Sequence, residues 1–188
     1  KFRDFNEKKI IQEVQKKLKF PVVIKPINEG SSVSVYICKK NNFFSNLKKL
    51  RHYDEILIEK FIPGREIQVA ILGNEKLGVI ELKPKRKFYD YEAKYNPKAK
   101  TEHIIPVNIS KKNYDKVTSI ALKAHKLLKC RGVTRSDFRF DGKKFYLLET
   151  NTQPGMTALS LVPEIARYRN ISFAKLIDKI LLDASINK

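Results

Sequence analysis

The sequence VTRSDFRFDGKKFYLLETN, residues 133–151, contains two candidate strands separated by a turn. Residues 133–140 and 145–149 are predicted to be two strands, and the turn pair Asp141-Gly142 lies between them. Side chains alternate along a strand, so Arg135 and Asp137 share one face. The segment therefore predicts a β-hairpin that presents charged groups together.

The length of the turn decides which face of this hairpin carries Glu149. A two-residue Asp-Gly turn would place Glu149 on the face opposite to Asp137. A three-residue turn pairs Asp137 with Leu147 and Arg135 with Glu149, and the three charged groups then converge. Convergence therefore requires an odd number of residues in the loop between residues 140 and 144.

Converging side chains on this hairpin have a functional and a structural interpretation. The carboxylates of Asp137 and Glu149, with the amide oxygen of Asn151, are hard oxygen ligands suited to Mg²⁺ that holds phosphates. The alternative is a surface salt bridge between Arg135 and Glu149. The pattern alone favours neither.

The rest of the chain extends the hairpin into a mixed fold. A second hairpin is predicted over 66–72 and 76–82, and strands and helices follow one another without strict βαβ alternation. This arrangement favours an α+β fold over a doubly wound sheet. The other predicted elements are strands at 21–26, 33–38 and 55–60, and helices at 6–18, 42–51, 110–129 and from Ser172, the last burying Phe173, Leu176, Ile177, Ile180 and Ala184.

The composition narrows the functional class. The formal net charge of +19 is compatible with a nucleic-acid-binding module, which is the alternative function from a class other than enzymes. The lysines occur in dispersed pairs, however, and this favours a solvated basic surface. No apolar run approaches the ~20 residues of a membrane helix. Cys38 and Cys130 lie far apart, which suits reduced thiols in a cytoplasmic protein. The start at Lys1 is interpreted as a cut point inside a longer protein.

Two features near the N-terminus are candidates for phosphate binding. Lys25 follows an apolar run and precedes a proline, so its amine can reach into a cleft and bind a phosphate. The alternative is that the aliphatic part of the side chain packs on the protein and the amine extends into water. The turn Glu29-Gly30-Ser31-Ser32 can surround phosphates with backbone N–H groups, or be an ordinary hairpin turn.

Two further segments are candidates for nucleotide binding and closure. The strand 56–60 ends before a Pro63-Gly64 turn, and its backbone can form hydrogen bonds with the edge of an adenine. Glu66 can accept hydrogen bonds from ribose hydroxyls. The alternative is that Glu59 and Glu66 are plain surface residues, as glutamates more often are. Segment 83–103 lacks periodicity and contains an aromatic run at 88–95. A loop of this length is usually functional, so a lid is expected there.

Taken in order, these stretches resemble the D-alanine–D-alanine ligases of the ATP-grasp superfamily, from about Lys19 onward. Two motifs are highly specific to that family: Tyr-Asp-Tyr-Glu-Ala-Lys-Tyr at 89–95 and Asn-Thr-Gln-Pro-Gly-Met-Thr at 151–157. The other matching stretches are Val23-Ile24-Lys25-Pro26, Glu29-Gly30-Ser31-Ser32-Val33, Leu57-Ile58-Glu59-Lys60, Tyr146-Leu147-Leu148-Glu149 and Ser160-Leu161-Val162-Pro163.

The resemblance implies an ATP-grasp fold, in which two α+β subdomains grip ATP in the cleft between them. Residues 1–62 would form the small (lid) subdomain, and residues 63–188 the large catalytic subdomain with a flexible loop at 85–103. The family's N-terminal substrate domain, which supplies an acidic residue for the first D-alanine, would precede residue 1. The complete protein is expected to be a cytoplasmic homodimer that binds neither nucleic acid nor membrane.

The resemblance also implies a reaction for peptidoglycan and cell-wall synthesis. ATP phosphorylates the carboxylate of one D-alanine, and the amine of a second attacks the acyl phosphate. The implied cofactors are ATP and two Mg²⁺ (or Mn²⁺) ions, with the metal ligands Asp137, Glu149 and Asn151. The implied ATP-binding residues are Lys25, Ser31, Ser32, Glu59, Lys60, Ile62, Glu66 and Lys94. The implied catalytic residues at the oxyanion are Arg135 and Gly155, and those at the closing lid are Ser31, Lys94 and Tyr95. The carboxylate of the second D-alanine is expected to bind to Ser160 and Leu161, at the N-terminus of a helix.

One departure and one alternative accompany the resemblance. Ser34 stands in the phosphate turn where family members commonly have glycine, which bears on the flexibility of that turn. The alternative function is an ATP-grasp ligase with D-lactate or D-serine as acceptor, because much of that selectivity lies in the loop and the N-terminal domain.

Overall fold

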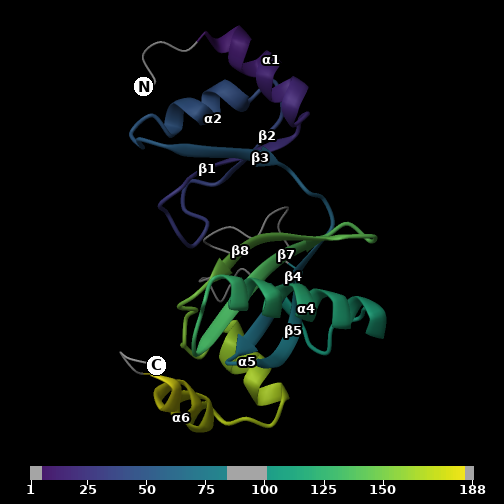
Figure 1. Cartoon of the computed structure of the whole chain (residues 1–188). Helices are drawn as coiled ribbons and strands as arrows, with labels where there is room; N and C mark the ends of the chain where they lie inside the picture. Colours follow the sequence, from purple (N-terminus) through teal and green to yellow (C-terminus); the bar gives the residue numbers. More distant parts are fainter. Residues whose placement is uncertain (1–5, 84–100, 185–188) are drawn as a thin grey trace. The chain divides into compact units, whose positions relative to one another are not determined.

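The computed structural model describes residues 6–83 and 101–184, which fall into two compact units (Figure 1). The first comprises residues 6–61, and the second comprises residues 62–83 and 101–184. Each unit has its own sheet and its own buried core.

The first unit is a small antiparallel sheet with two helices. Its strand order is β2-β1-β3, and its core gathers apolar residues of the strands with Phe43 and Leu47 of the second helix. Asn6 caps the first helix by accepting a hydrogen bond from the N–H of Lys9, as the sequence predicts. The elements are α1 (Glu7–Lys17), β1 (Val22–Pro26), β2 (Tyr36–Cys38), α2 (Phe43–Lys49) and β3 (Ile56–Lys60).

The predicted strand at 33–38 is wrong over its first half, since β2 begins at Tyr36. Ser31, Ser32 and Ser34 have positive φ angles, between 54° and 61°. This left-handed conformation is incompatible with an extended strand, so the residues before Tyr36 form turns.

The second unit is a five-stranded antiparallel sheet of order β6-β5-β4-β7-β8 with three helices. The mixture of antiparallel sheets and helices confirms the α+β expectation. Residues 102 and 103 belong to a strand rather than to the predicted loop, and residues 84–100 lie outside the described part of the chain. The elements are β4 (Arg65–Leu72), β5 (Glu75–Lys83), β6 (Glu102–Ile104), α4 (Lys111–Leu127), β7 (Val133–Phe140), β8 (Phe145–Asn151), α5 (Leu161–Tyr168) and α6 (Phe173–Asp183).

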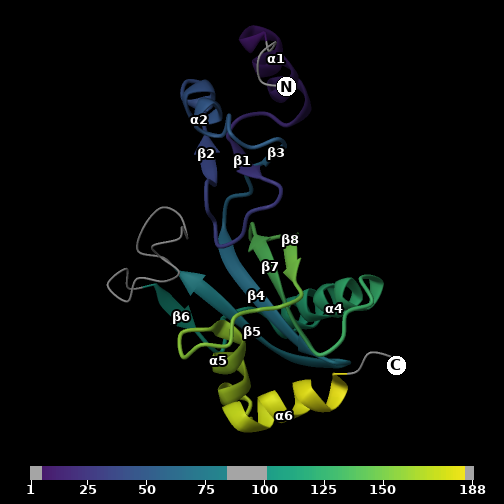
Figure 2. The same cartoon turned by 90° about the vertical axis from the view of Figure 1, so that its left-hand side faces the viewer.

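Two helices pack on opposite faces of this sheet (Figure 2). Helix α4 covers a face whose core includes Ile67, Val69 and Phe138. Helix α5 covers the other face, where a Cβ atom on Gly78 would lie 2.6 Å from Ile165, so only glycine permits the close approach. Ala70 of β4 pairs with Gly78 and therefore points to the α5 face. Because side chains alternate along a strand, Gln68 and Glu66 point to the same face.

Helix α6 follows α5 and is buried less than the sequence suggests. Leu176 is buried as expected, but the expected burial of Phe173 and Ala184 is wrong, because 52% of the surface of Phe173 is exposed and Ala184 is exposed as well. The helix buries Leu176, and Asp183 at its end accepts a hydrogen bond from the N–H of Gly132. None of the helices in the described ranges combines the length and apolar character that crossing a membrane requires.

Candidate functional site

The β7–β8 hairpin brings the predicted metal ligands together on the α5 face of the large sheet. Asp137 pairs with Glu149, and Arg135 pairs with Asn151. Directly opposed residues of antiparallel strands have Cβ atoms about 4.5–5.5 Å apart and point to the same side. The convergence that the sequence predicted is therefore present.

The route to this convergence differs from the predicted odd-numbered turn, which is wrong. Phe140 pairs with Phe145, so the loop holds residues 141–144, an even number, and Asp137 pairs with Glu149 rather than with Leu147. A register shift between Asp137 and Phe138 leaves Leu148 of β8 without a partner on β7. This β-bulge moves Glu149 back to the face of Asp137.

The loop of the hairpin is stabilised by Asp141. Its Oδ1 atom accepts hydrogen bonds from the backbone N–H groups of Lys143 and Lys144, at 2.8 and 2.7 Å. The bond from Lys144, followed by that from Lys143, lowers the pKa of Asp141 below its ordinary value. A four-residue loop is therefore the conformation that this sequence favours.

The charged groups of the site form an ion pair different from the predicted one. Arg135 donates to both carboxylate oxygens of Asp137, from Nε at 2.8 Å and from Nη2 at 3.1 Å. The structure gives this bidentate bond in place of the salt bridge to Glu149 considered from the sequence. Arg135 thereby compensates the charge of Asp137, which is 7% exposed, while Glu149 is exposed and able to meet a ligand.

The donor atoms of this face fit a hard divalent cation. Asp137 and Glu149 offer carboxylate oxygens, and the amide oxygen of Asn151 accepts one hydrogen bond, from the N–H of Gln153 at 2.9 Å, which leaves a second lone pair. Nowhere in the described ranges do three or more His, Cys, Asp or Glu residues gather around one point. Phosphate and water oxygens would therefore have to complete the coordination of Mg²⁺.

Arg139 is a site residue that the sequence analysis missed. It lies opposite Glu66 on the same face and donates from Nη1 to that carboxylate at 3.3 Å. It also donates to the backbone carbonyls of Ile62, at 3.1 Å, and Gly64, at 2.6 Å. Arg139 thus orients Ile62 and Glu66, which are both expected to bind nucleotide. Its position two residues after Asp137, on the same face of the strand, could have identified it from the sequence.

Within the first unit, the strand candidates Lys25 and Glu59 contact each other. Lys25 pairs with Leu57 and Glu59 pairs with Val23, which makes the two charged residues diagonal neighbours on one face. Their side chains form a salt bridge of 2.9 Å between Nζ and Oε1. The Lys25 side chain is 21% exposed, so it is partly withdrawn from water. Lys60, at the end of the same strand, is exposed.

The serine turn of this unit has a strained backbone. Ser31, Ser32 and Ser34 all adopt left-handed conformations, and the N–H of Val33 bonds to the carbonyl of Gly30. The hydroxyl groups of Ser34 and Tyr53 are hydrogen-bonded at 3.2 Å. Ser34 therefore adopts the backbone conformation that glycine would supply at lower cost, and its side chain is held in place.

In the second unit, the segment after the hairpin leads to a helix N-terminus. Ser160 is the N-cap of α5 and Leu161 is its first residue, as expected. The hydroxyl oxygen of Ser160 accepts from the N–H of Thr157 at 2.9 Å, and a Cβ on Gly155 would lie 3.0 Å from that oxygen. The expected oxyanion and carboxylate residues are thus neighbours. Lys94 and Tyr95 lie outside the described residues.

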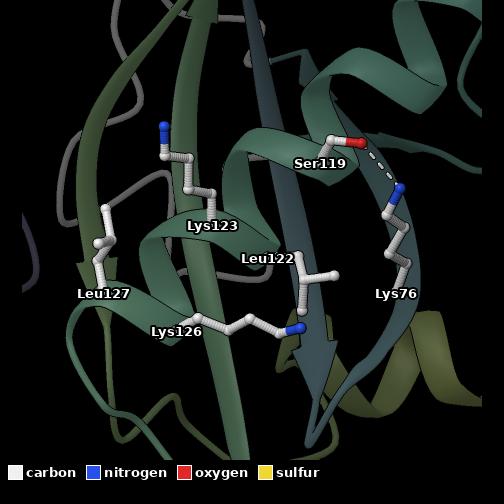
Figure 3. Close-up of a pocket in the computed structure, with 6 residues that line it drawn as sticks. All are labelled: Lys76, Ser119, Leu122, Lys123, Lys126 and Leu127. Carbon is white, nitrogen blue, oxygen red and sulfur yellow. Dashed lines mark hydrogen bonds between the residues drawn. The ribbon is translucent and has the colours of Figure 1, made fainter.

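A separate hollow on the α4 side of the large sheet is not part of this site (Figure 3). Its volume is about 380 Å³, and Lys76 spans its edge by donating to the hydroxyl of Ser119 at 2.8 Å. Lys76 pairs with Ile71, which belongs to the apolar core on the α4 side. The lining residues are Lys76, Ser119, Leu122, Lys123, Lys126 and Leu127.

Known proteins share this chain's sequence and fold. The D-alanine--D-alanine ligase of Pelagibacter ubique is 67% identical over 192 residues, covering 100% of this chain and 63% of that protein. Two crystal structures of the D-alanine--D-alanine ligase from Bacillus anthracis, one complexed with ATP, match with TM-scores of 0.81 and 0.77 at 34% and 29% identity. Each covers 97% of this chain, and the matches span 58% and 57% of those chains.

A ligase with a different printed acceptor is also similar. The VanG D-Ala:D-Ser ligase from Enterococcus faecalis matches with a TM-score of 0.78 at 28% identity, over 94% of this chain and 53% of that one. The chain therefore spans less than two thirds of the length of each of these proteins. Together with the α+β architecture, these similarities confirm the ATP-grasp fold. The family model described as D-ala D-ala ligase C-terminus matches residues 2–182, and the chain belongs to this family.

Proposed function

We propose that the protein carrying this chain is an ATP-dependent D-alanine–D-alanine ligase of peptidoglycan synthesis. The observation that carries the proposal is the placement of Asp137, Glu149 and Asn151 on one face of the large sheet, in a chain of this family. Arg135 lies in the same row of side chains. A ligase acting through an acyl phosphate needs such a combination of hard oxygen ligands and a cation.

ATP is the proposed nucleotide, because a structural relative at 29% identity is complexed with it. The proposed contacts within the first unit are Lys25 with phosphates, Ser31 and Ser32 over them, and the 59–60 backbone with adenine. In the second unit, Ile62 is proposed to complete the adenine contact and Glu66 to bind the ribose. The Lys25–Glu59 salt bridge supports the first assignment, because it keeps the amine on a defined strand face.

Two metal ions, Mg²⁺ or Mn²⁺, are proposed at Asp137, Glu149 and Asn151. When bound, such ions offset the negative charge of the transferring phosphoryl group. The first D-alanine carboxylate attacks the terminal phosphorus of ATP, and ADP leaves. The amine of the second D-alanine then attacks the acyl carbon and loses a proton. The bond between the acyl carbon and the phosphate oxygen breaks, so phosphate leaves and the dipeptide remains.

Arg135 and the N–H of Gly155 are proposed to stabilise the oxyanion that forms on the acyl carbon. Ser160 and Leu161 are proposed to bind the carboxylate of the second D-alanine, which suits the partial positive charge of the α5 N-terminus. Lys94 and Tyr95 are proposed to act on the closing loop, with Ser31.

The organisation of the complete protein is part of the proposal. Residues 1–62 and 63–188 are proposed as the small and the large catalytic subdomain, with an N-terminal substrate domain before them. A cytoplasmic homodimer, without nucleic-acid or membrane partners, is proposed as the working form.

The test is phosphate release by the complete protein with ATP, Mg²⁺ and D-alanine, with the dipeptide identified by mass spectrometry. We expect release that requires both D-alanine and Mg²⁺ and yields one dipeptide per phosphate. D-Lactate and D-serine, each added with D-alanine, test the alternative acceptors. Salt-sensitive binding to DNA or RNA, without phosphate release under any of these conditions, would instead support the nucleic-acid-binding module.

A further inference from the structure

Gln68 is a buried polar residue on β4 to which no role has been assigned. Its side chain is 1% exposed, and its Oε1 atom has no hydrogen-bond partner within the described residues. Buried amide oxygens in folded proteins nearly always have a partner, because leaving one unsatisfied is costly. The donor for Gln68 is therefore expected to be a group that binds next to it.

The register of the sheet places Gln68 beside the proposed metal ligands. It pairs with Asp137 of β7 on one side and with Ile80 of β5 on the other. Ile80 belongs to the fully buried, apolar part of the α5 face, and Asp137 begins the charged part. Gln68 thus lies at the boundary between the two, on the same face as Asp137.

The chemistry of that layer limits what can donate to Oε1. Arg135 donates from Nε and from Nη2 to the carboxylate of Asp137. Carboxylates and nucleotide phosphates are acceptors at neutral pH. Mg²⁺ retains several of its waters when it binds to proteins, and such waters direct their hydrogens away from the cation. A water of this kind is the donor that fits.

We propose that Gln68 is a positioning residue that holds a water of the Mg²⁺ coordination shell at Asp137, by accepting its hydrogen bond on Oε1. The inference rests on the proposed function, because it requires Mg²⁺-nucleotide to bind at this face. It adds a neutral acceptor to the site, one that orients the ligands of the cation without changing the charge of the site.

The test compares Gln68→Met, which keeps the shape and removes the acceptor, with Gln68→Glu, which keeps an acceptor of the same reach. Binding of the ATP analogue AMP-PNP to the complete protein is measured by calorimetry with Mg²⁺ and with EDTA, alongside the melting temperature without ligand. Ser136→Ala is the matched control. Ser136 is buried on the opposite face of the same sheet, and its hydroxyl bonds to that of Thr150 at 2.9 Å.

We expect Gln68→Met to weaken AMP-PNP binding roughly three- to tenfold with Mg²⁺, the usual effect of one lost hydrogen bond, and to leave binding in EDTA unchanged. Its melting temperature should stay the same or rise by about 2–4 °C, since an unsatisfied buried group is removed. Gln68→Glu should bind AMP-PNP with Mg²⁺ at least as tightly as the parent, because it keeps the acceptor and adds a negative charge beside the proposed cation site. Ser136→Ala should show the reverse, a lower melting temperature with unchanged Mg²⁺ dependence.

Two results would overturn the inference and leave the proposed function standing. One is Mg²⁺-dependent affinity in Gln68→Met equal to that of the parent. The other is a lower melting temperature with an equal loss of binding in Mg²⁺ and EDTA, which would make Gln68 a purely structural residue. Failure of the parent itself to bind AMP-PNP with Mg²⁺ would instead overturn both the inference and the proposed function.

Discussion

Asp137 on β7 lies directly opposite Glu149 on β8, although an even number of residues joins the two strands. The pairing depends on Leu148, the extra residue of the bulge, which shifts the later part of β8 by one position. Without that shift, Leu148 would face Asp137, and Glu149 would point to the α4 side. One unpaired leucine therefore determines whether the two carboxylates meet.

Deleting Leu148 is predicted to preserve the site. The deletion removes the bulge, and Glu149 then follows Leu147 and still pairs with Asp137. Inserting one alanine between Leu148 and Glu149 moves Glu149 to the opposite face. We expect Mg²⁺-dependent AMP-PNP affinity, measured by calorimetry, within about threefold of the parent for the deletion and at least about tenfold weaker for the insertion. Equal affinities of both variants would show that the register does not matter.

Ser34 is predicted to be under backbone strain that glycine relieves. Ser34→Gly and Ser34→Ala both remove the hydrogen bond to Tyr53, so their difference isolates the backbone. The glycine variant should be more stable by about 1 kcal/mol in urea unfolding, because only glycine adopts a φ near +57° without steric cost. Equal unfolding free energies would mean that the turn is not strained at this position.

Arg139→Ala is predicted to lower the free energy of unfolding by about 2–4 kcal/mol, because it removes bonds to Ile62, Gly64 and Glu66 from a side chain that is 19% exposed. Lys179→Ala is the control, since Lys179 belongs to an exposed salt bridge and should cost less than about 0.5 kcal/mol. Urea unfolding measures both. A similar cost for the two substitutions would contradict the anchoring role of Arg139.

The stability of the second unit is predicted to fall as the pH drops below about 6.5, the ordinary pKa of histidine. Burial lowers the pKa of His125, whose Nδ1 and the hydroxyl of Thr134 are 2.9 Å apart. Between the lowered and the ordinary pKa, the unfolded chain binds more protons than the folded one. The unfolding free energy therefore rises with pH in that window.

Urea unfolding at pH 7.5, 6.5 and 5.5 measures this dependence for the parent and for His125→Gln. The variant should lose the part of the slope that His125 contributes. Identical slopes in the two proteins would rule out His125 as the titrating group.

The sequence predicted most elements of both sheets, because alternation, turn residues and the Asn6 cap are local signals. It also predicted that Asp137 and Glu149 meet. It could not predict how they meet, since a bulge at Leu148 follows from the competition between loop geometry and packing of the whole sheet. A one-residue shift leaves no mark in the hydrophobic pattern when Leu147 and Leu148 are both partly exposed.

Other features escaped prediction for the same reason. The contacts of Arg139 to two backbone carbonyls depend on where the chain enters β4, which residue types do not reveal. The unsatisfied oxygen of Gln68 follows from the register of three strands. The predicted burial of Phe173 failed because helical periodicity identifies an apolar stripe but not how much of it finds a partner.

The most direct test of the account is Mg²⁺-dependent nucleotide binding by Glu149→Gln. The substitution removes one negative charge from an exposed side chain of the proposed cation site, and Glu75→Gln, at an exposed position away from the hairpin, is the control. We predict at least about tenfold weaker AMP-PNP binding with Mg²⁺ for Glu149→Gln alone, with unchanged melting temperatures for both variants. Parental affinity in Glu149→Gln would contradict the assignment of this face as the cation site.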